Sequence, residues 1–177
     1  MMLKTLKYKN GIAAMECLIP LARQRIVHIG CGDGALVFEL AKRTVFRVNN
    51  DPVQVQINRA LGSFPKVTAM EEFTQNLPQN DGRVDCVIFA NYLSQIDARD
   101  MDECLGEACR ILKEVDGFLY VLEKDASGLY DSILRMFDDQ SAVRVCAGDS
   151  LLRMPQSFFA SAREIHYSVK QGFPSFD

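Results

Sequence analysis

The sequence lacks the features that place a protein in or across a membrane. No apolar run within its 177 residues approaches the roughly 20 residues that a membrane-spanning helix needs. The first residues are basic, but neither a stretch of pure hydrophobes nor a small-residue cleavage site follows them. We therefore expect no membrane partner and no secretory signal, and a protein that stays in the cytoplasm.

Metal ligands and excess positive charge are also scarce. The two histidines, His28 and His166, are far apart in the sequence, and none of the six cysteines forms a C-x-x-C pair, so we expect no metal site. The chain has 20 Lys and Arg against 23 Asp and Glu, and the basic residues are scattered. A nucleic-acid-binding surface needs basic residues gathered on one face, so we expect no nucleic-acid partner.

The pattern of apolar residues is that of an alternating α/β domain. Short buried runs typical of strands alternate with helical spacing, which favours one hydrophobic core built on a parallel sheet. After a basic tail over residues 1–11, apolar residues from 12 to 22 predict a helix that is bent or restarted near Pro20, since proline lacks the N–H that a helix interior needs. Strands are predicted at 25–29, 44–49, 66–69, 84–90 and 118–122.

The chain beyond the fifth predicted strand is harder to interpret. Helical spacing is clear in residues 101–112 and is repeated in 129–137. Residues 142–146 and 163–170 both have strand-like alternation, and a helical or irregular piece with Phe158 and Phe159 separates them. These last elements complete the predicted domain.

A glycine-rich turn follows the first predicted strand and precedes a helix. Gly30, Gly32 and Gly34 lie in this turn, where glycine lets the backbone approach a ligand at the helix N-terminus. Two alternatives exist: a tight turn that serves packing only, and a dinucleotide-binding turn, because Gly30-x-Gly32-x-x-Ala35 satisfies G-x-G-x-x-A. The glycines alone do not separate these interpretations.

Three longer segments carry a family resemblance. Residues 26–43 (IVHIGCGDGALVFELAKR), 85–96 (DCVIFANYLSQI) and 108–123 (ACRILKEVDGFLYVLE) resemble motif I, the fourth strand with its loop, and the "R-x-L-K-x-G-G-x-L" helix and fifth strand of class I S-adenosylmethionine-dependent methyltransferases. The resemblance covers about residues 12–125. The third segment has no counterpart in the dinucleotide fingerprint, which favours the methyltransferase interpretation over nicotinamide binding.

The resemblance implies a fold, a cofactor and a reaction. The implied fold is a single Rossmann-like domain over residues 1–177, with a mostly parallel seven-stranded sheet and helices on both faces. Residues 12–125 would form the cofactor-binding core, and residues 126–177 the C-terminal strands and helix. The cofactor would be S-adenosylmethionine, with S-adenosylhomocysteine as product. Methyl transfer gains rate mainly from proximity and alignment, so no dedicated nucleophile is required.

The resemblance also implies site residues. Asn91 and Tyr92, after the fourth predicted strand, would lie beside the reactive methyl as catalytic residues. The implied cofactor-binding residues are His28, Gly30, Cys31, Gly32, Gly34, Asn49, Asn50, Glu71 and Asn91. The alternative for Asn91 and Tyr92 is a capped loop with a half-buried aromatic ring.

Two residues depart from the family pattern. His28 and Asn49 stand where the family usually has acids, one near the amino-acid end of the cofactor and one on its ribose. An amide oxygen accepts a hydroxyl proton in the same geometry as a carboxylate, about tenfold more weakly. His28 could donate to the cofactor carboxylate or be a core histidine. These departures motivate a second hypothesis, a catalytically inactive binding or scaffold subunit.

The acceptor is only partly constrained. The N-P-P-Y tetrapeptide typical of nucleic-acid base methylation is absent, so we expect a small-molecule acceptor. No large insertion separates the predicted strands, so the acceptor pocket would come from the tail, the loop after Ala90, the segment around Phe158, or another chain. A protein partner or a homodimer is therefore left open.

Overall fold

The computed structural model describes residues 6–22, 24–30, 35–41, 46–50, 67–70, 76–124, 135–154 and 158–169. Their elements, in chain order, are β1 (Leu6–Tyr8), α1 (Gly11–Leu18), β2 (Arg25–Ile29), α2 (Ala35–Ala41), β3 (Phe46–Asn50), β4 (Val67–Met70), β5 (Cys86–Ala90), the 3₁₀ turn η1 (Leu93–Gln95), α4 (Met101–Ile111), β6 (Phe118–Leu122), α6 (Ser141–Arg153) and β7 (Tyr167–Val169).

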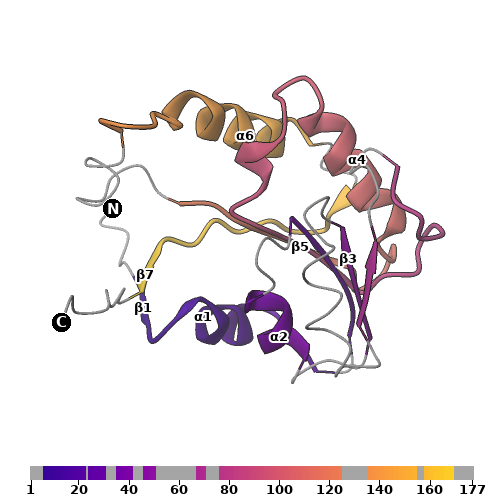
Figure 1. The fold of residues 1–177 in the computed structure, drawn as a ribbon. Helices are drawn as coiled ribbons and strands as arrows, with labels where there is room; N and C mark the ends of the chain where they lie inside the picture. Colours follow the sequence, from indigo (N-terminus) through magenta and orange to yellow (C-terminus); the bar gives the residue numbers. More distant parts are fainter. Residues whose placement is uncertain are drawn as a thin grey trace.

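A parallel five-stranded sheet forms the centre of the molecule (Figure 1). Its strand order is β4-β3-β2-β5-β6, with every neighbouring pair parallel. From β2 the chain moves outward to β3 and β4 and then crosses to the other side of β2 to form β5 and β6. The strand order reverses between β2 and β5, and in open α/β sheets ligands bind at the carboxyl ends of the strands at such a reversal. The predicted α/β class and parallel sheet are confirmed.

Helices cover both faces of this sheet. In Figure 1, α4 and α6 lie above the sheet, and α1 and α2 lie below it. Because successive strand residues point to opposite faces, Val27 and Phe89 join the core under α4, while Ile26 and Ile88 join the core beside α1 and α2. All four side chains are at most 1 % exposed, so the sheet is buried on both sides, as expected for parallel strands.

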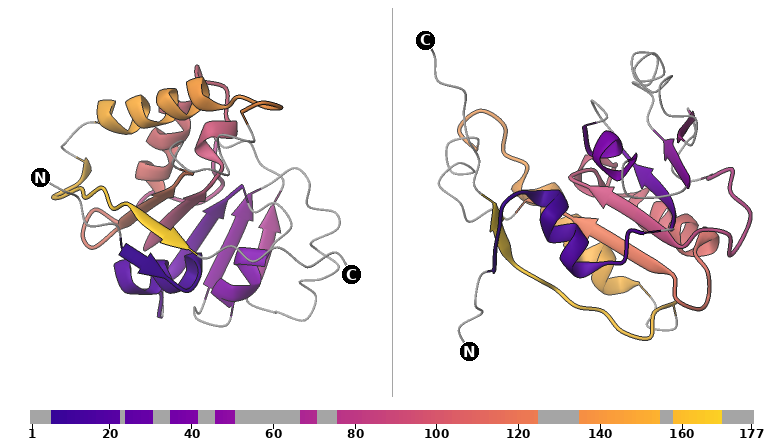
Figure 2. Two further views of the ribbon diagram at one scale, coloured as in Figure 1. Left: turned by 90° about the vertical axis from the view of Figure 1, so that its left-hand side faces the viewer. Right: turned by 90° about the horizontal axis from the view of Figure 1, so that it is seen from below.

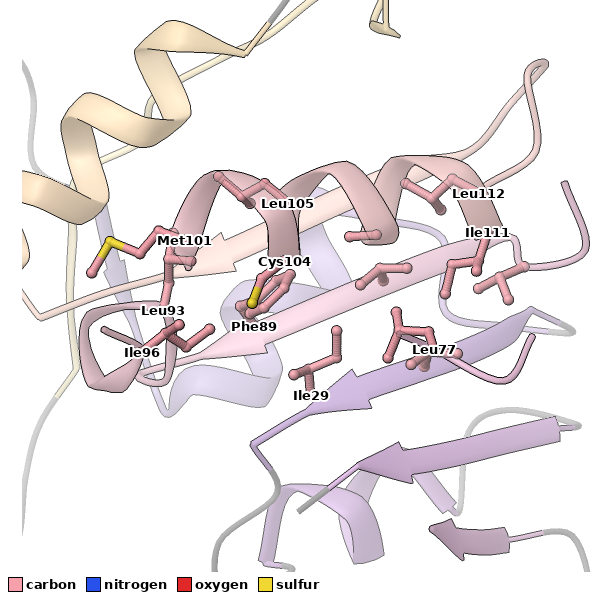
Figure 3. Close-up of a cluster of buried hydrophobic side chains, with 14 of the residues drawn as sticks. Ile29, Leu77, Phe89, Leu93, Ile96, Met101, Cys104, Leu105, Ile111 and Leu112 are labelled. Atoms are coloured by element: carbon pink, nitrogen blue, oxygen red, sulfur yellow. The ribbon is translucent and has the colours of Figure 1, made fainter. Parts of the chain in front are cut away.

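The helix α4 has the helical periodicity that the sequence predicted. Its buried residues are Met101, Cys104, Leu105, Ala108 and Ile111, a spacing that faces one side of a helix. In Figure 3, Cys104 of α4 lies over Phe89 of the sheet, and all five residues belong to the same buried cluster as Phe89 and Ile29. Acidic residues in the first turn and Arg110 in the last complement the helix dipole.

Two predictions near the ends of the chain were wrong. Residues 142–146, predicted as a strand, belong to α6, because Ala147 and Ser150 repeat at helical spacing and pack toward α4. The alternation of apolar and polar residues that suggested a strand covers only Val143 to Val145, which is too short to determine the secondary structure. In the N-terminal region α1 ends at Leu18, Ile19 is extended, and Pro20 follows, so the described residues show no restarted helix.

The predicted tail contains a short strand. Leu6–Tyr8 pairs in parallel with Tyr167–Val169, forming a separate two-stranded sheet seen in both views of Figure 2. The strand predicted at 163–170 is therefore present but shorter. Since the strands of the described residues form a five-stranded and a two-stranded sheet, a single seven-stranded sheet stays a prediction. The predicted helix over 129–137 falls largely outside the described residues.

No helix in the described ranges is both long enough and apolar enough to cross a membrane.

A buried carboxylate fastens the amino end of the sheet. Asp85 precedes β5, is 8 % exposed, and accepts a hydrogen bond from the Arg25 N–H at 2.7 Å. It also pairs with the ammonium group of Lys113. Burial raises the pKa of Asp85, but the Lys113 ammonium and the Arg25 N–H outweigh this effect and hold the pKa below its usual value of 3.8.

The Asp85→Asn variant is expected to lower the free energy of unfolding by about 2 kcal/mol near neutral pH, because a hydrogen bond to a charged group nets about 1.5 to 3 kcal/mol. The depressed pKa means that this contribution is complete above the unfolded-state pKa and is lost as pH falls below it. Urea unfolding at several pH values between 7 and 3 should therefore show a smaller acid-induced loss in Asp85→Asn. The exposed turn residue Asp116 provides the control Asp116→Asn, since asparagine tolerates its left-handed backbone. Parallel pH profiles for wild type and Asp85→Asn would contradict this role.

Candidate functional site

The carboxyl ends of β2 and β5 meet in a close contact between Gly30 and Tyr92. Gly30 follows β2 and has φ +71°, a left-handed conformation that favours glycine. A Cβ at this position would overlap the Tyr92 ring. The half-buried Tyr92 ring therefore lies directly over the backbone of Gly30. The structure thus brings Gly30, an implied cofactor residue, against Tyr92, an implied catalytic residue.

Asn91 is also left-handed, with φ +53°. Its N–H donates to the Leu122 carbonyl at 2.7 Å, and its carbonyl accepts from Gln95 Nε2 at 2.5 Å. These bonds connect the end of β5 to the end of β6 and to η1. Asparagine tolerates this conformation better than most residues, and such backbone conformations cluster at functional sites.

The loop after β5 is fastened to β6 by a carboxylate. Glu123, the residue after β6, accepts from the Ser94 N–H at 3.1 Å through Oε1 and from Ser94 Oγ at 2.8 Å through Oε2. Ser94 is 8 % exposed, so this double hydrogen bond is shielded from water. It fixes η1 next to β6 and thereby holds the preceding Asn91 and Tyr92 in place.

His28 lies in the middle of the sheet. It is 3 % exposed on the central strand β2, where it pairs in register with Asn49 of β3 and Ile88 of β5. It shares the strand face of Ile26, which points toward the core beside α1 and α2. This burial fits the core-histidine alternative and leaves a contact with cofactor as a proposal.

The other implied cofactor residues divide into two groups. Asn49 and Asn50 are the last two residues of β3, in register with His28 and Ile29 at the carboxyl end of the sheet. The remaining predicted cofactor-binding residues lie outside the described residues: Cys31, Gly32, Gly34 and Glu71.

A small polar hollow adjoins the carboxyl ends of β5 and β6. Its lining residues come from the loop after β5, the end of β6 and the start of α6: Asn91, Ser94, Gln95, Glu123, Lys124, Gln140 and Arg144. Of these, only Asn91 was singled out from the sequence. Ser94, Gln95 and Glu123 lie within the segments that resemble the family, and polar residues directly after buried strands could have indicated them. Gln140 and Arg144 carry no such signal: Arg144 lies in the segment 142–146 that was predicted as a strand, and Gln140 lies just before it.

Comparison with known proteins decides the family. Residues 26–115 match a family described as a methyltransferase domain, and this match covers β2 through α4. The chain belongs to this methyltransferase family. The predicted resemblance to class I S-adenosylmethionine-dependent methyltransferases is confirmed, and S-adenosylmethionine is the cofactor of that family.

Curated relatives agree with this assignment. Uncharacterized methyltransferases of Mycobacterium tuberculosis and Mycobacterium bovis are 26 % identical over 100 residues, which is 56 % of this chain and 40 % of theirs. The methyltransferase chain thus spans less than half the length of these curated relatives.

Two solved structures share the fold. Phosphoethanolamine N-methyltransferase 1 of Haemonchus contortus, in complex with phosphoethanolamine and S-adenosylhomocysteine, superposes with a TM-score of 0.57 at 21 % identity, over 65 % of this chain and 26 % of that one. A protein assigned as a methyltransferase, in complex with the Haloferax volcanii Trm112 methyltransferase activator, gives a TM-score of 0.59 at 20 % identity, over 77 % and 66 % of the two chains. At these identities the likeness shows the Rossmann-like fold of the methyltransferase domain.

Proposed function

We propose that the protein transfers a methyl group from S-adenosylmethionine to a small-molecule acceptor at the carboxyl ends of β2, β5 and β6. The observation that carries this proposal is the contact between Gly30 and the Tyr92 ring. It brings the glycine turn, which faces the ligand in this fold, against the loop where an acceptor would lie. The absence of a side chain at residue 30 makes room for the Tyr92 ring against this backbone.

The residues at this end of the sheet are suited to the cofactor. Gly30 would let the backbone approach the cofactor, and Asn49 or Asn50 at the end of β3 would accept hydroxyl protons of its ribose. S-adenosylmethionine, when bound, supplies an electrophilic methyl on a sulfonium. We propose that Cys31, Gly32, Gly34 and Glu71 complete this contact surface, and that His28 supports it from the sheet.

Asn91 and Tyr92 would act on the acceptor. Both are half-buried, and their backbone is held by the Leu122 carbonyl, Gln95 and the Ser94–Glu123 hydrogen bonds. Side chains on such a fixed loop can orient an acceptor at little entropic cost, which is the main source of rate in methyl transfer. No proton transfer at these residues is required by the proposal.

The alternative of an inactive scaffold gains no support from the comparisons, since the matching relatives are methyltransferases. The complex with an activator protein concerns a structural neighbour only. A protein partner or a second copy of this chain therefore stays part of the proposal, as do a single domain over residues 1–177 and a cytoplasmic location.

Cofactor binding is expected to stabilise the purified protein. A ligand present at about 100 times its Kd adds about 2.7 kcal/mol to the free energy of unfolding, which for this size raises Tm by about 5 to 10 °C. Differential scanning fluorimetry with S-adenosylmethionine, S-adenosylhomocysteine and NADH tests this. NADH is the matched control for a dinucleotide interpretation. A shift with NADH and none with either sulfur nucleoside would contradict the proposal.

The transfer itself needs a second experiment. Metabolite pools incubated with methyl-labelled S-adenosylmethionine should yield a labelled small molecule. No transfer under saturating cofactor, together with stoichiometric co-purification of another chain, would favour the scaffold alternative.

A further inference from the structure

The hollow beside Asn91 has a distinctive charge. Two cations, Lys124 and Arg144, and one carboxylate, Glu123, line it. Both carboxylate oxygens of Glu123 accept hydrogen bonds from Ser94, one from the N–H and one from Oγ. The charged lining residues therefore sum to one positive charge, and Asp139, outside the lining, also interacts electrostatically with Arg144.

Arg144 is suited to bind an anion in this hollow. It is half-buried on the first turns of α6, and its Nη2 lies 3.5 Å from Gln140 Oε1, on the preceding turn. A guanidinium offers five donors in a planar fork that matches the oxygens of a carboxylate or phosphate. Lys124, two residues after β6, lines the same hollow and supplies a second, flexible cation.

We propose that this hollow binds an anionic group, a carboxylate or phosphate, of the methyl acceptor. The inference rests on the proposed function, since it makes the hollow the acceptor's anchoring site. Asn91 borders both the hollow and, through Tyr92, the glycine turn. An acceptor anchored through its anionic end at Arg144 and Lys124 would therefore extend toward Asn91 and Tyr92, where the methyl group would be received.

Titration with simple anions tests the site without an acceptor. The full chain would be titrated with sodium phosphate and, separately, with sodium acetate at constant ionic strength, with the backbone amide signals of Lys124 and Arg144 followed by NMR. We expect saturable shifts of both signals. The anion that binds more tightly would identify the acceptor's group as phosphate or carboxylate.

Matched variants locate the binding. Arg144→Gln is expected to weaken anion binding about tenfold, because it removes a charge-assisted bidentate contact. Lys124→Gln, at an exposed residue, should weaken it less. Arg83→Gln is the control: Arg83 is exposed and lies before β5, at the opposite end of the sheet. Circular dichroism would verify that each variant is folded.

The outcomes separate this inference from the proposed function. No saturable shift, or equal affinity in wild type and Arg144→Gln, would overturn the anion site even if S-adenosylhomocysteine binds. Anion binding that depends on Arg144, in a protein that binds no S-adenosylhomocysteine, would overturn the proposed function and the acceptor role while retaining the anion site. Binding of both, with the loss confined to Arg144→Gln and Lys124→Gln, supports the inference.

Discussion

The Gly30→Ala variant is expected to lower the free energy of unfolding by about 3 kcal/mol and to weaken binding of S-adenosylhomocysteine more than tenfold. Two effects combine at this residue. A left-handed backbone costs a non-glycine residue about 1 to 2 kcal/mol, and overpacking adds about 1 to 3 kcal/mol. The added methyl group would force the Tyr92 ring away from the glycine turn. Urea unfolding and calorimetric titration measure the two losses.

Gly82 provides a matched control for the backbone effect. Its φ is +64°, close to that of Gly30, but a Cβ there would meet no atom within 4 Å. Gly82→Ala should therefore cost only about 1 kcal/mol and leave cofactor affinity unchanged. Adding Tyr92→Ala to Gly30→Ala should recover part of the lost stability, because it removes the ring that the methyl group would meet. Equal losses in Gly30→Ala and Gly82→Ala would show that the ring does not pack on Gly30.

The second large effect is expected at Glu123. Glu123→Ala removes the acceptor of both the Ser94 N–H and Ser94 Oγ, and a buried donor left without a partner costs about 1 to 3 kcal/mol. We expect a loss of about 3 kcal/mol in the free energy of unfolding. Hydrogen exchange at residues 91–96 should accelerate, because the loop is no longer fastened to β6. Urea unfolding and exchange mass spectrometry provide these readouts.

Conservative variants separate this contact from a general loss of charge. Glu123→Gln keeps one acceptor oxygen and should lose less than half as much stability as Glu123→Ala. Glu114→Ala, at an exposed turn residue, should change neither stability nor exchange in the loop. In a double-mutant cycle, Glu123→Ala and Ser94→Ala should be strongly non-additive. Additive losses would mean that the two residues act independently.

The helices and strands that could be predicted are those whose own residues show a clear pattern of buried apolar positions. β2, β5 and α4 have continuous or helically spaced apolar residues that identify them without their neighbours, as Ile26, Val87 and Leu105 illustrate. In α6 only Ala147 and Ser150 are buried in a helix of weakly segregated polarity, so local β-branched residues misled the prediction. Residues 141–153 form a helix because they pack against α4, and the local sequence pattern carries no information about that contact.

The candidate site was predicted to a similar extent. Gly30 was singled out by the glycine-rich turn and Tyr92 by the family resemblance of the segment after β5, and the structure brings them into contact. The Ser94–Glu123 pair could not be predicted, since it joins residues 29 positions apart whose separate segments carry no signal of pairing. Arg144 was not predicted as a site residue because its segment was predicted as a strand and not as the helix α6. Long-range polar contacts thus need the fold before they can be recognised.

The position of Asp85 has a consequence for how such a domain can change over evolution. Its ion pair with Lys113 and its hydrogen bond from the Arg25 N–H stabilise the amino end of the sheet, opposite to Asn91 and the polar hollow. Substitutions in the polar hollow that change which ligand is bound therefore leave the contacts of Asp85 at the amino end intact. Recognition residues such as Arg144 can therefore vary without disturbing this end of the sheet, provided that Gly30 and the Ser94–Glu123 hydrogen bonds, which stabilise the recognition end, are kept.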